Sequence, residues 1–131
     1  MLKVVIHFRD GSIRRGTIAS FPPHGTRFVL NIAGRAETRD ISLHDLKAVF
    51  FVKELRGLPD YRESKKFPSR GKSDGLSGRV RVVCADGEIL VGYCDEYRAN
   101  QPGLFLYPPD RGSNNERVYI LAGAIEKLEF I

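Results

Sequence analysis

One stretch of sequence occurs twice in this chain, and this internal repeat constrains the fold more than any other feature. Residues 4–21, VVIHFRDGSIRRGTIASF, align with residues 80–97, VRVVCADGEILVGYCDEY, at a constant offset of 76. The offset becomes 77 at Phe28 and Phe105, which indicates an insertion in the second copy. Each copy of such a repeat is one structural unit. The chain therefore contains two halves of about fifty residues each.

Both copies have the patterns of short β-strands. Apolar side chains at positions 2, 4, 6 and 8 have the period of a strand with one buried face. Asp10-Gly11 and Asp86-Gly87 then predict hairpins, because the turn needs the positive φ that Gly adopts without steric cost. Gly16 and Gly92 lie inside the second strand of each copy, where a glycine marks a bend or a close approach of another backbone. Later strands are predicted at residues 27–32, 39–43 and 47–52, and at residues 104–107, 117–121 and 126–131.

These patterns predict an all-β protein of two tandem five-stranded barrels, of Sm-like or SH3-like size, joined by a linker. Bending at the strand glycines lets a short sheet curl into a barrel. We place the first barrel at residues 1–54 and the second at residues 79–131. Residues 55–78 contain two Pro, four Gly and many charges without an apolar period, which is typical of a flexible linker.

The last strand of the first copy differs from its counterpart. Residues 46–52 align with residues 125–131 at an offset of 79, but Ala48 to Val52 is apolar on both strand faces, whereas residues 127–131 alternate. This strand is therefore expected to pack beyond its own barrel, against the second copy or against another subunit. Phe50 and Phe51 are the candidate protein-interface residues.

The order of these features resembles the Sm-like barrel of the LSm and Hfq type. The matching features are an Asp-Gly turn, a Gly five residues later, an aromatic residue five further, and short strands that end in a β-branched and aromatic run. The sequence also resembles bacterial tandem Sm-like proteins of unknown function, through LKAVFFVK at 46–53 and PPDRGSNNERVYI at 108–120. The resemblance covers both halves and implies binding of single-stranded, uridine-rich RNA and assembly into rings.

Two Sm-like signatures are absent. The acidic residue that usually follows the aromatic position is missing after Phe21, where Pro22-Pro23-His24-Gly25 follows, and after Tyr97. The Arg-Gly type turn before the last strand is also missing in both copies. Because fold transfers between relatives better than function does, the RNA prediction depends on charge rather than on these signatures.

Basic residues concentrate in the first half of the chain. Residues 1–53 carry a net charge of +5, residues 54–79 carry +3, and residues 80–131 carry −3. A basic surface binds phosphate because it releases counterions, and aromatic side chains stack on unpaired bases. The candidate RNA-binding residues are Arg14, Arg15, Phe21, His24, Arg27, Arg35 and Arg39. Ordinary solvated surface is the competing interpretation of these arginines.

The charge distribution and one arginine pair allow two further interpretations. The opposite charges of the halves permit docking of the halves or of two molecules, so a protein-interaction module with an unknown partner, including a second copy, is the alternative function. The pair Arg35 and Arg39 is similar to the spaced arginines of a PilZ domain. The companion motif of that family is not completed by residues 40–45, so we attribute the match to chance.

Residues for catalysis or for metal binding are not grouped in the sequence. The three His residues have no Cys or carboxylate at metal-ligand spacing, and the second half contains no His near Cys84 or Cys94. We therefore expect packed free thiols, no enzyme activity, no cofactor and no metal. The longest apolar run has five residues, and no secretion signal is evident at the N-terminus, so we expect no membrane span and a cytoplasmic protein.

Overall fold

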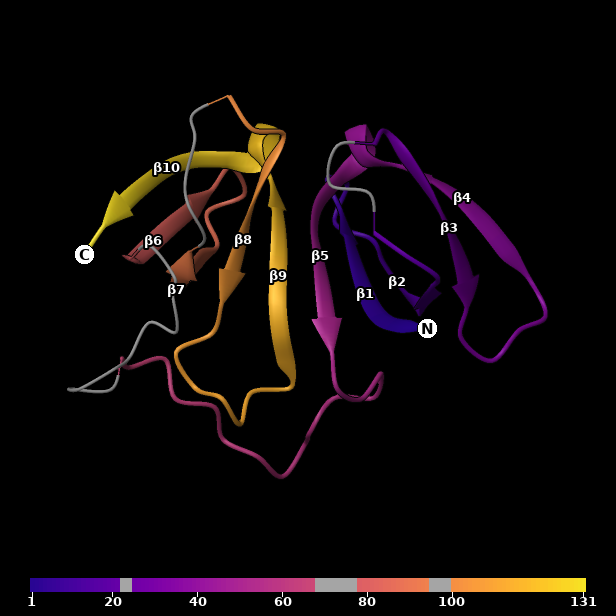
Figure 1. Cartoon of the computed structure of the whole chain (residues 1–131), viewed down its shortest axis with the longest axis horizontal. Helices are drawn as coiled ribbons and strands as arrows, with labels where there is room; N and C mark the ends of the chain where they lie inside the picture. The colour runs from indigo at the N-terminus through magenta and orange to yellow at the C-terminus, as the bar shows by residue number, and fades with distance from the viewer. Residues whose placement is uncertain (22–24, 68–77, 95–99) are drawn as a thin grey trace.

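The computed structural model describes residues 1–21, 25–67, 78–94 and 100–131, which form ten antiparallel strands and two short 3-10 helices (Figure 1). The first half contains β1 (Leu2–Phe8), β2 (Ile13–Ile18), β3 (Arg27–Ile32), β4 (Thr38–Ser42), η1 (Leu43–Asp45) and β5 (Leu46–Val52). The second half contains β6 (Gly78–Cys84), β7 (Ile89–Cys94), β8 (Gly103–Tyr107), β9 (Asn115–Leu121), η2 (Ala122–Ala124) and β10 (Ile125–Phe130). The all-β class and the five strands of each half are confirmed.

The two Asp-Gly hairpins have the same construction. Gly11 and Gly87 both have a φ of +91°, which Gly adopts without steric cost. In each turn the Asp side chain accepts a hydrogen bond from the backbone N–H two residues later, at 2.8 Å from Ser12 to Asp10 and at 3.0 Å from Glu88 to Asp86. The predicted turns are therefore confirmed, and each Asp stabilises its own loop.

The strand glycines are sites of close backbone approach. A Cβ on Gly16 would lie 2.0 Å from the carbonyl oxygen of Asn31, and a Cβ on Gly92 would lie 2.4 Å from that of Tyr107. Only a residue without a side chain lets the second and third strands of each half come this close.

The structure corrects the repeat alignment at Phe28. Phe28 pairs with Ile41 in the first half, and Ile120, which follows Ile41 by 79 residues, pairs with Leu104. Leu104 is therefore the structural counterpart of Phe28, and Phe105 faces the opposite side of the sheet. The insertion in the second copy lies instead in the loop between β8 and β9.

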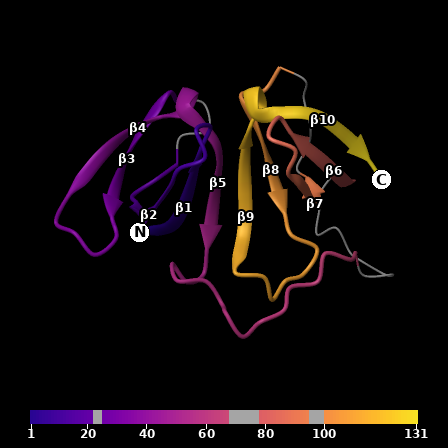
Figure 2. The same cartoon turned by 180° about the vertical axis from the view of Figure 1, so that it is seen from behind.

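All ten strands belong to one open sheet rather than to two separate closed sheets. The strand order is β10-β6-β7-β8-β9-β5-β1-β2-β3-β4, so β5 of the first half pairs with β9 of the second half. Figures 1 and 2 show these two strands side by side at the centre, with one half on each side. Because β5 hydrogen-bonds to β1 on one side and to β9 on the other, the two halves are joined by backbone pairing.

The two halves bury opposite faces of this sheet. On β5, Val49 and Phe51 belong to the hydrophobic cluster of the first half, whereas Ala48, Phe50 and Val52 belong to that of the second half. On β9 the division is the same, with Tyr119 and Leu121 in the first cluster and Val118 and Ile120 in the second. Each core therefore includes side chains from the other half. This packing buries every residue of β5 and confirms that its apolar faces pack against the second copy.

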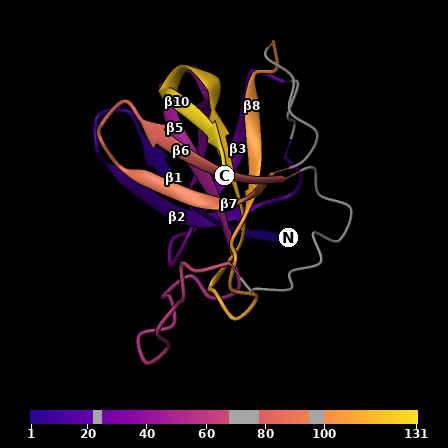
Figure 3. The same cartoon turned by 90° about the vertical axis from the view of Figure 1, so that its left-hand side faces the viewer.

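The connecting segment, residues 55–67, is docked on the loop between β8 and β9 (Figure 3). The Tyr61 hydroxyl donates to Asp110 at 2.7 Å, and the Ser64 backbone N–H donates to the same carboxylate at 2.9 Å. These hydrogen bonds hold the pKa of Asp110 below its ordinary value, the bond from Ser64 having the largest effect. The described part of this segment is therefore not the free tether that its composition predicts.

Candidate nucleic-acid interface

A row of arginine and aromatic side chains crosses the sheet on the face opposite the second core. Arg79 pairs with Tyr93, Tyr93 pairs with Tyr107, and Arg117 pairs with Phe51. Leu106 pairs with Val118, so the next residues along those two strands, Tyr107 and Arg117, lie opposite each other. Paired residues of antiparallel strands point to the same face. We call these five residues the arginine–aromatic row.

Arg117 lies near the β5 end of this row, where the two halves meet. Its guanidinium carbon lies 4.5 Å from the centre of the Phe51 ring and 4.6 Å from that of Phe105. The cation–π contacts orient the guanidinium while leaving Arg117 half-exposed. At the other end of the row, Phe67 of the connecting segment packs edge-on against Tyr93 at 5.0 Å and lies beneath Arg79.

Aromatic rings from both halves pack around Phe51 and Phe105, the two rings that contact Arg117. Phe105 packs against Tyr119 with ring centres 4.8 Å apart, and Phe21 packs against Phe51 at 5.3 Å and against Tyr119 at 5.0 Å. Phe21 and Phe105 are half-buried, whereas Phe51 and Tyr119 are buried. Edge-to-face packing of this kind fixes ring orientations and gives a rigid surface for stacking.

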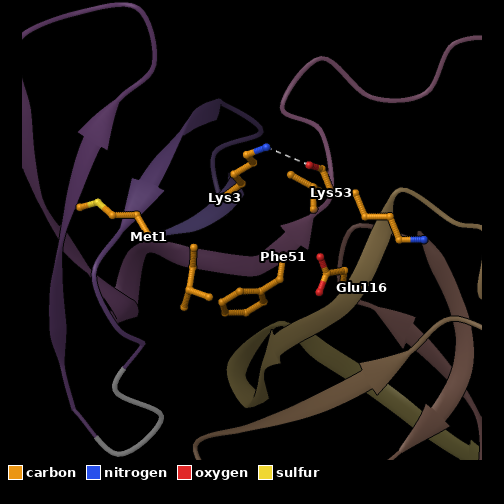
Figure 4. A pocket seen from close by; sticks show the side chains of 7 residues that line it. Met1, Lys3, Phe51, Lys53 and Glu116 are labelled. Carbon is orange, nitrogen blue, oxygen red and sulfur yellow. Dashed lines mark hydrogen bonds between the residues drawn. The ribbon is translucent and has the colours of Figure 1, made fainter.

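A cavity of about 230 Å³ lies next to this cluster, at the ends of β1, β5 and β9 (Figure 4). Its lining residues are Met1, Leu2, Lys3, Phe51, Val52, Lys53 and Glu116. Lys3 Nζ donates to the carbonyl oxygen of Lys53 at 3.2 Å, and Lys53 Nζ donates to that of Arg111 at 2.7 Å. An ammonium group has three donors, so both lysines keep donors for a ligand. We call this cavity the junction pocket.

The sequence-predicted arginines do not form one cluster. Lys3 and Asn31 both pair with Thr17, so these three residues point to the outer face of the first half. Arg15 lies two residues before Thr17 and Arg27 lies four residues before Asn31, so strand alternation places both arginines on that face. Arg14 points to the opposite face, since it pairs with Ile6 of the first core.

The other predicted residues are dispersed. Arg27 forms a 2.8 Å ion pair with Asp40, and Arg35 lies 3.7 Å from Glu37, although exposed pairs of this kind are weak. Arg39 lies on edge strand β4. Of the aromatic candidates, Phe21 joins the ring cluster beside the row, and His24 lies outside the described residues.

The candidate interface residues Phe50 and Phe51 are both buried within the chain. They retain 8% and 4% of their exposure, because the pairing of β5 with β9 covers both faces of the strand. The partner surface predicted for them is thus occupied by the second half of the same chain.

A buried lysine joins the halves at the other end of β5. Lys47 Nζ lies 2.6 Å from Asp86 and also binds Glu88, both in the hairpin of the second half. Burial alone would lower the pKa of Lys47, but the bonds to these carboxylates outweigh it and raise the pKa. Burial also lowers the pKa of His7, whose ring lies 4.4 Å from that of Phe50. Lys47 and Asp86 also line a smaller cavity, and their ion pair links the two halves.

The most informative residues of the candidate interface, Arg117, Tyr107 and Lys3, were not singled out from the sequence. The net charge of −3 on residues 80–131 instead favours the first half as the basic surface. A local signal exists, since Phe105 with Tyr107 and Arg117 with Tyr119 each share a strand face at a spacing of two residues. The cross-strand register that brings these pairs together is not visible in the sequence.

Metal sites, membrane-spanning helices and disulfides are absent from the described ranges. Among these residues no group of three or more His, Cys, Asp or Glu side chains is placed to hold a metal ion. The described helices are all too short to cross a membrane. Cys84 and Cys94 are buried in the second core as thiols rather than as a disulfide.

A family model described as a family of unknown function (DUF6982) matches residues 1–131. Searches of curated proteins and of solved structures give no match.

Proposed function

The chain belongs to this family of unknown function, and we propose that it is a non-catalytic protein that binds single-stranded RNA where its two halves meet. Bases would stack on the exposed part of the arginine–aromatic row, and phosphates would bind Arg117 and Lys3. In this proposal each half is an Sm-like module, and the two modules share one binding surface.

The stacked position of Arg117 carries the proposal. A guanidinium held against Phe51 and Phe105 presents a flat, charged surface beside the half-buried ring of Tyr107. Proteins that bind single strands combine positive charge with aromatic side chains in this way, because every base has a face that stacks. Arg79 adds positive charge at the far end of the row, and Lys3 adds positive charge at the junction pocket.

Support for Sm-like modules comes from the order of elements in each half. Both halves have four strands, a 3-10 turn and a final strand, with the Asp-Gly hairpin first and a close-packed glycine in the second strand. The missing acidic position suggests that RNA would not use the usual Sm-like loop pocket. The junction pocket and the arginine–aromatic row provide an alternative location.

The test is fluorescence anisotropy of a short uridine-rich RNA and a matched DNA at several salt concentrations. We expect a log affinity that falls with log salt by about 0.7 per phosphate contacted. Arg117→Gln, which removes the charge and the guanidinium plane but keeps a polar side chain, should weaken binding at every salt concentration and reduce this slope by about one contact. No binding at low salt would overturn the proposal.

The double variant Arg14→Glu, Arg15→Glu is the matched comparison. These residues lie on β2, away from the row, so the variant separates the first-half arginines from the junction. If the double variant abolishes binding and Arg117→Gln leaves it unchanged, the RNA lies on the first half and the junction site is wrong. Circular dichroism of each variant shows whether it remains folded.

A second candidate function is self-association through the two sheet edges, β4 and β10. These edges are the repeat counterparts of β9 and β5, the two strands that pair at the centre of the sheet. In the central pairing Phe50 lies opposite Val118. Suppose that β10 of one molecule pairs with β4 of the next in this same register. The repeat offset of 79 then places Glu129, the counterpart of Phe50, opposite Arg39, the counterpart of Val118. This opposite-charge pair favours a second copy as the partner.

Charge reversal tests this second function. Lys127 and Glu129 occupy the positions of Ala48 and Phe50, so the edge pairing would bury little apolar surface and would be sensitive to salt. Arg39→Glu and Glu129→Arg should each weaken association in sedimentation velocity, and the combined variant should restore it. A protein that stays monomeric at high concentration and low salt would overturn this candidate.

A further inference from the structure

The junction pocket has one polar wall and one apolar wall. Figure 4 shows the Glu116 carboxylate beside the Phe51 ring, with Lys3 on the opposite side of the β1 and β5 ribbons. Met1, Leu2 and Val52 complete the apolar lining. Its volume of about 230 Å³ lies below the roughly 300–1,000 Å³ of pockets that enclose drug-sized ligands. A single planar ring system is the size of ligand that this space suits.

Glu116 gives the pocket a hydrogen-bonding preference. The residue is exposed, and within the described ranges no side chain forms an ion pair or hydrogen bond with its carboxylate. An ionised carboxylate only accepts hydrogen bonds, through two oxygens side by side. It therefore selects a ligand edge that carries two adjacent N–H donors.

We propose that the junction pocket binds one unpaired guanine base of the RNA, with the guanine N1–H and N2–H donating to the two Glu116 oxygens. The apolar lining contacts the base, and Lys3 binds an adjacent phosphate. This inference rests on the proposed RNA binding and names the base that one position of the site selects.

The other bases fit the carboxylate less well. Uracil has one N–H donor between two carbonyl oxygens, which the carboxylate repels. Adenine and cytosine each place an amino donor next to a ring-nitrogen acceptor. Each can therefore form one hydrogen bond to Glu116 instead of two. A bidentate contact to a base edge gives roughly 5- to 150-fold discrimination against the wrong base.

The experiment compares the RNAs UUUGUUU, UUUAUUU, UUUCUUU and UUUUUUU by anisotropy at one salt concentration. We expect the guanine-containing RNA to bind roughly 5- to 150-fold more tightly than UUUUUUU. Glu116→Gln, which removes the charge and replaces one acceptor oxygen by a donor, should bring this ratio near one. Glu126→Gln, at an exposed position on β10 outside the pocket, is the matched control and should keep the preference.

Several results would overturn this inference. Equal binding of all four RNAs by the wild-type protein would refute the guanine pocket and leave RNA binding intact. A guanine preference that survives in Glu116→Gln would place the selecting group elsewhere.

The mononucleotides separate failure of the pocket from failure of RNA binding. Guanosine 5′-monophosphate and uridine 5′-monophosphate are compared by saturation-transfer NMR with the same protein. If no RNA binds but guanosine monophosphate does, the pocket stands as a nucleotide site and the RNA proposal is wrong. If neither RNA nor mononucleotide binds, both proposals are wrong.

Discussion

Replacement of Phe50 by Ala should destabilise the whole chain, because this first-half residue packs in the core of the second half. Its side chain is 8% exposed, belongs to the cluster of Val118 and Ile120, and has its ring 4.4 Å from that of His7. Truncation of a buried Phe to Ala costs about 3–5 kcal/mol of unfolding free energy. Since β5 contributes to both cores, we also expect one cooperative unfolding transition in the wild-type protein and in the variant.

Urea unfolding followed by far-ultraviolet circular dichroism and tyrosine fluorescence measures this effect. With an m-value of about 1–3 kcal/mol/M, the midpoint of Phe50→Ala should fall by at least about 1 M. Phe130→Ala is the matched control, because Phe130 is 61% exposed on β10 and its loss should cost less than about 1 kcal/mol. A Phe50→Ala cost near that of the control, or separate transitions by the two signals, would refute the shared cores.

Three other changes test the remaining features. Gly16→Ala should destabilise the protein by at least about 2 kcal/mol in the same urea titration, because the added Cβ would meet a β3 carbonyl oxygen at 2.0 Å. A cost below about 0.5 kcal/mol would contradict that contact. Lys47 lowers the pKa of Asp86, so their pairing stabilises the fold above the ordinary carboxyl pKa of about 3.9 and is lost as the pH falls through the lower folded-state pKa. Lys47→Met should therefore flatten the acid side of a Tm-against-pH curve, and an unchanged slope would remove this pair from the acid response. Asp110→Asn weakens the hydrogen bond from Tyr61 and should speed tryptic cleavage of the connecting segment, whereas unchanged cleavage would show that other contacts hold the segment.

Local patterns in the sequence were sufficient for the strands and for the hairpins. Alternation, the Asp-Gly pairs and the strand glycines depend on residues that are near one another in the chain, and the structure has β3 at Arg27–Ile32 as predicted. Part of the long-range arrangement was also accessible, since the two-faced apolar run of β5 indicated packing beyond its own half. The choice between the second copy and another subunit needed the structure, because either would bury the same side chains.

The candidate site was less predictable for the same physical reason. Charge counting favoured the first half, but strand alternation places Arg14 and Arg15 on opposite faces, so sequence neighbours do not make a common surface. Arg117 and Phe51 become neighbours only through the pairing of β5 with β9.

The sequence alone determined the repeat, the all-β class and the turns, because these follow from side-chain period and backbone preference within a few residues. The tertiary structure decided that the halves form one sheet with a core on each face. It also decided that Arg117, the aromatic rings and the junction pocket meet between the halves. Cross-strand register sets these contacts, and register depends on the simultaneous packing of both cores rather than on any local stretch of sequence.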